Sequence, residues 1–172
     1  MKKIKVNIKG IAPYLMNKFI EEKTGSRKKK EYIPKEEAEK KANRTEKREL
    51  YIPSQQIKAS IVKASTDFKM TGKKSYKEYI LSGIFISPDK IVLKPQEYTI
   101  FAHPVVIVRS RVMSWRPEFK EWEAEFIIEI VDDMINETTL KEILETAGKY
   151  KGIGDWRPEH GRFEVLSFKT LE

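Results

Sequence analysis

The chain has no cysteine and only two histidines, His103 and His160. Without cysteine it can form neither a disulfide nor a thiolate metal site, and nothing points to secretion. Walker A, dinucleotide-binding and zinc-binding patterns are also lacking, so we expect no cofactor and no metal. The beginning, Met-Lys-Lys-Ile-Lys-Val, contains no continuous apolar stretch. We therefore expect neither a signal peptide nor a membrane span, and a cytoplasmic location.

Few residues are candidates for catalysis. His103 precedes Pro104 at the start of a predicted strand, which favours a structural or an exposed position. His160 lies beside arginines in a glycine-rich segment, where an imidazole can act as general acid or base. Asp132 and Asp133 are adjacent and would point to opposite faces of a strand, so they form no carboxylate pair. We expect a non-enzymatic protein, and the alternative is a metal-independent endoribonuclease that uses His160.

Basic residues outnumber acidic ones, 34 to 26, and the formal net charge is +8. This excess favours a polyanionic partner. Residues 23–49 are predicted to be a basic insertion, because 23–48 hold eleven basic and five acidic residues, a net of +6. We expect this insertion to be partly helical after Pro34 and to clamp a nucleic acid. The alternative is a solvated loop without a partner.

Hydrophobic periodicity predicts the elements of the first half. Ile4, Val6 and Ile8 alternate with polar residues, which indicates a half-buried strand. A helix is expected to follow Ser54 as N-cap, and its buried stripe consists of Ile57, Ile61, Ala64 and Phe68. Residues 80–86 and 90–93 are expected to be short strands.

The second half is predicted to begin with a long antiparallel hairpin from Pro104 to Val131. Its arms are residues 105–115 and 122–130, its turn begins at Arg116, and Arg111 would lie near Glu123 and Glu125. A second helix is expected to start with a capping box of Thr139 and Glu142, and its buried residues are Leu140, Ile143, Leu144 and Ala147. A strand over residues 163–168 comes last.

The long elements therefore follow the order strand, helix, strand, strand, helix, strand. This is the βαββαβ order of a ferredoxin-like, or RRM-like, fold. We predict one α+β domain over residues 1–172, with an antiparallel sheet, both helices on one face, a basic insertion and a long β-hairpin.

A glycine-rich loop joins the second helix to the last strand. It contains Gly152, Gly154 and Gly161, together with Trp156, Arg157 and Arg162. Glycines allow a ligand to approach the backbone closely, while arginines and an indole suit phosphates and base faces. The alternative is a plain helix-to-strand connection with a glycine C-cap, in which Glu159 and Glu164 pair with the arginines.

The run Gly-Ile-Gly…Gly-Arg-Phe, from Gly152 to Phe163, resembles the glycine-rich loop of the RAMP superfamily, the RNA-recognising proteins of CRISPR systems. The insertion after the first strand and the long hairpin resemble that superfamily too. The segments Ile8-Lys-Gly-Ile-Ala-Pro-Tyr-Leu-Met16 and Gly152-Ile-Gly-Asp-Trp-Arg-Pro158 are also similar to a family of short phage and prophage proteins.

The RAMP resemblance implies a protein that binds single-stranded RNA or DNA along its backbone, like the backbone subunit of a CRISPR effector complex. It implies further copies of the chain in a row, and CRISPR-complex proteins as partners. Phage genome handling, or interference with a host complex, would be its use. The alternative is a phage structural protein whose basic loops bind an acidic partner. Nucleic-acid-binding residues are predicted in the loops: Arg27, Lys28, Lys29, Lys30, Lys73, Lys74, Lys77, Arg116, Trp156, Arg157 and Arg162.

Overall fold

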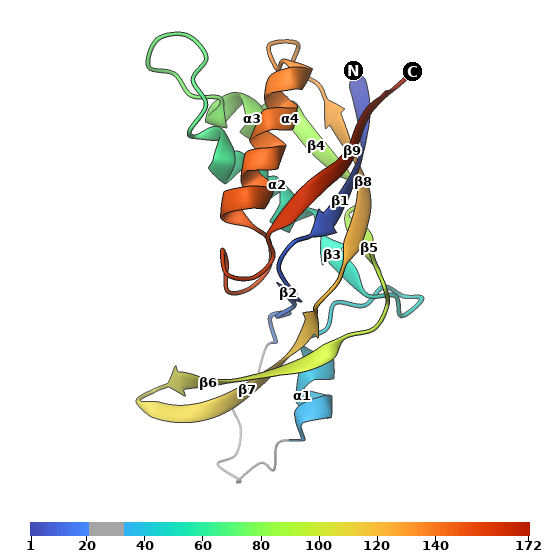
Figure 1. The fold of residues 1–172 in the computed structure, drawn as a ribbon, viewed down its shortest axis with the longest axis vertical. Helices are drawn as coiled ribbons and strands as arrows, with labels where there is room; N and C mark the ends of the chain where they lie inside the picture. The colour runs from blue at the N-terminus through green and yellow to red at the C-terminus, as the bar shows by residue number, and fades with distance from the viewer. Residues whose placement is uncertain (21–32) are drawn as a thin grey trace.

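The computed structural model describes residues 1–20 and 33–172, and within them the protein is α+β with two antiparallel sheets (Figure 1). The main sheet has the order β3-β5-β8-β1-β9, and β4 also pairs with β8. Its strands are β1 (Lys2–Gly10), β3 (Tyr51–Pro53), β4 (Ile84–Ser87), β5 (Lys90–Lys94), β8 (Glu123–Ile130) and β9 (Phe163–Leu171). The predicted first strand and the strand at residues 90–93 are confirmed.

The two faces of the main sheet differ because side chains alternate along β1 and β8. Ile4, Val6 and Ile8 are fully buried, as are the alternate residues of β8 that pair with them. On the open face, Lys3 lies 3.2 Å from Glu129 and Lys5 lies 3.1 Å from Glu125. Such exposed ion pairs contribute only about 0–1 kcal/mol each. The free energy of folding therefore comes mainly from the buried face.

Helices supply the other half of the core. They are α2 (Ser54–Ser65), α3 (Lys77–Gly83) and α4 (Glu137–Thr146), which is followed by a π-helical turn, η1 (Ala147–Lys151). The predicted stripe of the second helix is confirmed, since Leu140, Ile143, Leu144 and Ala147 are fully buried. In the first helix Ile57, Ile61 and Ala64 are fully buried as predicted, but Phe68 lies beyond the end of α2 and is only partly buried. No helix of residues 1–20 or 33–172 is both long and apolar enough to cross a membrane.

A second, three-stranded sheet projects from the body at the lower end of the molecule (Figure 1). Its order is β2 (Tyr14–Leu15), β7 (Ser110–Phe119) and β6 (Thr99–Ile107). We call the β6–β7 hairpin the ribbon. Near its tip Val106, Ile107 and Val108 are 68%, 58% and 92% exposed. The ribbon therefore presents apolar side chains outside the main core.

The predicted hairpin from Pro104 to Val131 is wrong in its turn and in its pairing. The turn of the ribbon lies at Val108 and Arg109, whose φ angles of 44° and 67° are in the left-handed region. Two-residue hairpin turns need this conformation, but they usually signal it with Asn or Gly, which are lacking here. Arg111 consequently lies opposite Val106 and not near the glutamates, and β8 pairs with β1.

Three further predictions of local structure are corrected. Residues 80–83 belong to α3, and only residues 84–87 form the expected strand. Helix α4 begins at Glu137, because the side chain of Asn136 accepts hydrogen bonds from the backbone N–H groups of Thr138 and Thr139. The capping box of Thr139 and Glu142 does not form. Ser54 is the first residue of α2 and makes no side-chain cap.

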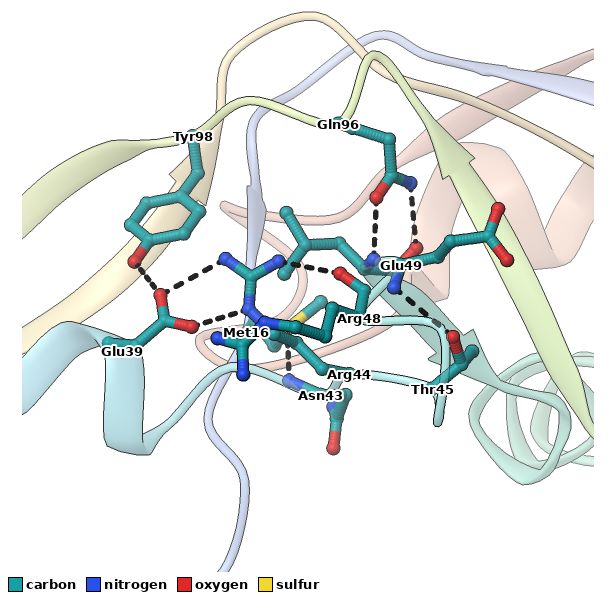
Figure 2. A network of polar contacts seen from close by, with 10 residues as sticks. Met16, Glu39, Asn43, Arg44, Thr45, Arg48, Glu49, Gln96 and Tyr98 are labelled. Carbon is teal, nitrogen blue, oxygen red and sulfur yellow. Dashed lines mark hydrogen bonds and ion pairs between the residues drawn. The ribbon is translucent and has the colours of Figure 1, made fainter.

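The described part of the basic insertion is folded. Helix α1 (Pro34–Lys40) follows Pro34 as predicted and contacts the ribbon. Figure 2 shows the carboxylate of Glu39 accepting hydrogen bonds from Arg44 and from the hydroxyl of Tyr98 at the base of the ribbon. The hydrogen bond from Arg44 lowers the pKa of Glu39, and burial raises the pKa of Tyr98 to about 12. Residues 33–49 are therefore not a disordered loop, while their contact with a nucleic acid stays a prediction.

Candidate functional site

The glycine-rich loop, residues 152–162, follows η1 and packs against β2. Gly152 ends η1 with a φ of 70°, which places the predicted glycine cap at this residue. The backbone N–H of Asp155 donates to the carbonyl oxygen of Leu15 over 3.1 Å. Gly154 has a φ of 80°, and a Cβ there would lie 2.7 Å from the Leu15 oxygen and against the Tyr14 ring. Gly154 therefore allows the loop to approach β2 closely.

Trp156 contacts the base of the ribbon. Its indole lies 4.1 Å from the His103 ring and 5.6 Å from the Phe101 ring, both centroid to centroid and edge-on. Phe101 and His103 are two residues apart on β6 and so share one face of the ribbon. Trp156 still keeps 38% of its surface exposed. It is neither a core residue nor a free side chain, because one part packs and another remains available.

Arg116 lies within the ribbon and not at a hairpin tip, which corrects the prediction. It pairs with Phe101 within the ribbon, and only 11% of its side chain is exposed. Its Nη1 lies 2.5 Å from Oδ2 of Asp155, an ion-pair separation without hydrogen-bond geometry. Neither Nε nor Nη1 has a hydrogen-bond acceptor among the described residues. Arg116 therefore positions Asp155 and is not an exposed phosphate contact.

His160 belongs to the same cluster. Its ring packs edge-on against Phe101, with centroids 5.4 Å apart, and Nε2 lies 4.0 Å from Oε2 of Glu118. Only 16% of the side chain is exposed, and its buried Nδ1 has no hydrogen-bond partner in the described part of the chain. These contacts are those of a packing residue rather than of an accessible acid or base.

Arg157 and Arg162 lie on the same loop but line different pockets. Arg157 is exposed beside a pocket of about 340 Å³ that the loop shares with α2. Arg162 lines a pocket of about 310 Å³ together with Lys149 and Tyr150. Within residues 1–20 and 33–172 neither guanidinium makes a hydrogen bond or an ion pair, so the alternative in which the two arginines pair with Glu159 and Glu164 is wrong.

A strip of cationic side chains follows one side of α2. Two pockets share Gln55 and Ala59, which places them end to end along this helix. The first contains Arg157. The second, about 490 Å³, is lined by Lys58, Lys63 and Lys77 and also by the apolar side chains of Ala59, Val62 and Leu81. From residue 55 to residue 63 the helix rises about 12 Å. We call these two adjoining pockets the α2 strip.

The other predicted residues are not all brought to the strip. Lys73 and Lys74 are exposed in the loop between α2 and α3, at the opposite end of the long axis from the ribbon (Figure 1). Lys77, at the start of α3, does reach the strip. Arg27, Lys28, Lys29 and Lys30 lie outside the described residues.

Sequence reasoning missed several residues of this site. Gln55 and Gln56 stand on the polar side of a recognised amphipathic helix, so their exposure was predictable but their proximity to Arg157 was not. Asn17, from the segment after β2, gave no sequence signal at all. The described residues contain no group of three histidine, aspartate or glutamate side chains that could hold a metal ion.

Comparison with known proteins finds no family model that matches this sequence and no curated protein that resembles it at a significant level. The function must therefore be argued from the geometry of the site.

Proposed function

We propose that this protein is a non-enzymatic, RAMP-like module that binds single-stranded nucleic acid along the α2 strip. The observation that carries the proposal is the set of unpaired cations there. Lys63, Lys77 and Arg157 make no side-chain ion pair or hydrogen bond within residues 1–20 and 33–172. Folding gives these charges no partner among the described residues, which favours a polyanion as their ligand.

A single strand fits this surface better than a duplex. The exposed part of Trp156 lies next to Arg157, and stacking on an indole requires a base that is not already paired. The open face of the main sheet offers no comparable surface, because Lys3 and Lys5 are paired with glutamates. The bound strand would therefore follow α2 and the glycine-rich loop.

The arrangement of the main sheet supports the RAMP-like part of the proposal. Strands β9, β1, β8 and β4 lie side by side and are antiparallel, and α2 and α4 connect β1 to β4 and β8 to β9 through the chain. This is the spatial order expected of a ferredoxin-like sheet formed by two interlocked βαβ units. The glycine-rich loop lies directly before the last strand of that order.

Assembly in a row along the strand is part of the same proposal. It is supported by the ribbon, which projects from the body (Figure 1) and carries exposed apolar side chains near its tip. Exposed apolar side chains gathered on one element are typical of contact with another protein, and a neighbouring copy would cover them. The endoribonuclease alternative has no comparable support, since the ring of His160 is packed between Phe101 and Glu118.

The proposal is tested by fluorescence anisotropy with a labelled oligouridine, an oligothymidine and a duplex of equal length, over a series of salt concentrations. We expect both single strands to bind more tightly than the duplex, with affinity falling as salt rises. Arg157→Gln should make the slope of log affinity against log salt shallower by about 0.7, because the variant neutralises one phosphate fewer. Light scattering on a longer strand should show mass rising in steps of one chain.

The matched control is Arg48→Gln, which removes one charge from an exposed arginine that lines neither pocket of the strip. Its salt slope should equal that of the parent. Absence of binding at low salt would contradict the function itself. Equal slopes for both variants would show that the strand follows another surface.

A further inference from the structure

The pocket between the glycine-rich loop and α2 is built from amide side chains. It is lined by Asn17, Gln55, Gln56, Ala59, Gly154, Asp155 and Arg157. Its volume of about 340 Å³ is near the lower end of the range of small-molecule pockets, roughly 300–1,000 Å³. That space suits one planar heterocycle. Primary amides carry a donor and an acceptor side by side, which suits the edge of a nucleobase.

A hydrogen bond from Tyr14 fixes the orientation of the Gln56 side chain. The hydroxyl of the fully buried Tyr14 donates a hydrogen bond to Oε1 of Gln56 over 2.7 Å. Burial raises the pKa of Tyr14, so this hydroxyl keeps its proton and remains the donor. Because Oε1 is engaged, the amide nitrogen Nε2 is the group of Gln56 left without a partner among the described residues. The pocket thus has a fixed hydrogen-bond donor.

Asn17 is oriented in the complementary way. Its Nδ2 donates to Oδ2 of Asp155 over 3.3 Å, and Asp155 is itself held by Arg116 and by its backbone bond to Leu15. The oxygen Oδ1 of Asn17 therefore remains as an acceptor with no partner in the described part of the chain. A ligand edge with one donor and one acceptor would satisfy both amides.

We propose that this pocket takes one adenine of the bound strand, with its 6-amino group donating to Asn17 and a ring nitrogen accepting from Gln56. The inference rests on the proposed function and adds base selectivity to it. Asparagine and glutamine are the side chains that pair with both polar atoms of an adenine edge. Uracil also carries a donor beside an acceptor, N3–H and a carbonyl oxygen, but on a smaller ring than adenine. Guanine placed in the same orientation as adenine would bring its carbonyl oxygen toward Asn17 Oδ1 or Asp155. Cytosine carries the same pair of groups on a smaller ring and leaves more of the pocket empty.

Competition binding tests this inference with four oligouridines that differ only at one central position, which carries uracil, cytosine, adenine or unsubstituted purine. We expect the adenine strand to bind about tenfold more tightly than the all-uracil strand. The purine strand should bind like the all-uracil strand. Purine has the same two rings as adenine but lacks the amino group, so this comparison separates hydrogen bonding by that group from ring size and stacking.

The deciding variant is Asn17→Ala, and its control is Asn7→Ala on the main sheet, outside both pockets of the strip. Asn17→Ala should abolish the preference for adenine, so that the adenine strand and the all-uracil strand bind the variant equally tightly. Asn7→Ala should retain the preference.

Equal binding of all four strands, a preference for cytosine, or an adenine preference that survives in Asn17→Ala would each overturn the inference and leave the proposed function standing. If no strand binds at all, the proposed function fails together with it.

Discussion

The side chain of Trp156 lies partly in a packed cluster and partly in solvent. One part of its indole packs against His103 and Phe101 of the ribbon, while 38% of its surface stays exposed. Its φ of 57° is in the left-handed region, which non-glycine residues rarely adopt. Such a conformation persists only where surrounding contacts hold it, and here the ribbon supplies them. The exposed part of the indole is therefore presented by a constrained loop.

Gly154 is the residue on which that loop depends most directly. Gly154→Ala would put a methyl group against the Tyr14 ring and 2.7 Å from the Leu15 oxygen, in a backbone conformation that already costs alanine about 1–2 kcal/mol. Gly72→Ala is the control, because its φ of 65° is similar but nothing lies within 4 Å of the added Cβ. Chemical denaturation should show Gly154→Ala to be less stable than Gly72→Ala by about 1–3 kcal/mol. Equal losses would mean that the loop is not held against β2.

Helix α4 connects the core to the glycine-rich loop, so its own stability bears on the site. The helix is fixed at its start by the side chain of Asn136 and along its length by Leu140, Ile143 and Leu144, which are fully buried. It leads directly into η1 and the loop. Disruption of α4 packing should therefore disturb the loop as well as the core.

The contributions of cap and core to α4 can be separated by thermal melting. Leu144→Ala should destabilise the protein by about 2–5 kcal/mol, because it leaves a cavity at a fully buried position. Asn136→Ala should cost about 0.5–2 kcal/mol because it removes the N-cap. Glu142→Ala, at an exposed position outside the cap, should change stability by no more than about 0.5 kcal/mol. A Glu142 variant less stable than the Asn136 variant would contradict the assigned start of the helix.

The whole molecule consists of a main sheet with helices on one face and of a projecting ribbon. The α2 strip lies on the helical side of the main sheet. Lys58 of α2 contacts both α3 and β4, since its Nζ donates hydrogen bonds to the carbonyl oxygen of Ile80, over 2.7 Å, and to that of Ile84. The ammonium also lies 5.7 Å from the centroid of the Phe85 ring. Burial lowers the pKa of Lys58 from 10.5 to about 8. Global stability should therefore respond to pH through this residue.

The direction of the pH effect follows from proton binding. Below about pH 8 Lys58 is charged in both states, so the folded protein bears the full cost of desolvation. Between about 8 and 10.5 the unfolded chain holds more protons, and the free energy of unfolding rises with pH. The stability of the parent relative to Lys58→Met should therefore increase from about pH 7 to about pH 10. Denaturation curves at both pH values measure it.

Lys63→Met, at an exposed position of the same helix, should show no such change relative to the parent. A constant difference for Lys58→Met would mean that the two carbonyl contacts and the Phe85 ring, which favour the charged form, offset desolvation completely.

Much of the fold could be predicted from the sequence, because periodicity is a local property of the chain. The alternation in β1 and β8 and the stripes of α2 and α4 each mark a buried face without reference to any other element. The order of the long elements indicated an α+β protein for the same reason. The ribbon turn was misplaced because Val108 and Arg109 adopt left-handed conformations that their residue types do not signal.

The sequence by itself thus determined the class of fold, the buried faces and the presence of a cationic, glycine-rich loop before the last strand. Only the tertiary structure decided that Arg116 is enclosed and that Arg157 is exposed. It also decided that Asn17 meets Asp155, 138 residues further along the chain, beside Gln56 of α2. Residue type fixes what a side chain can bond, but the path of the backbone fixes which groups remain unpaired, and those groups form the candidate site.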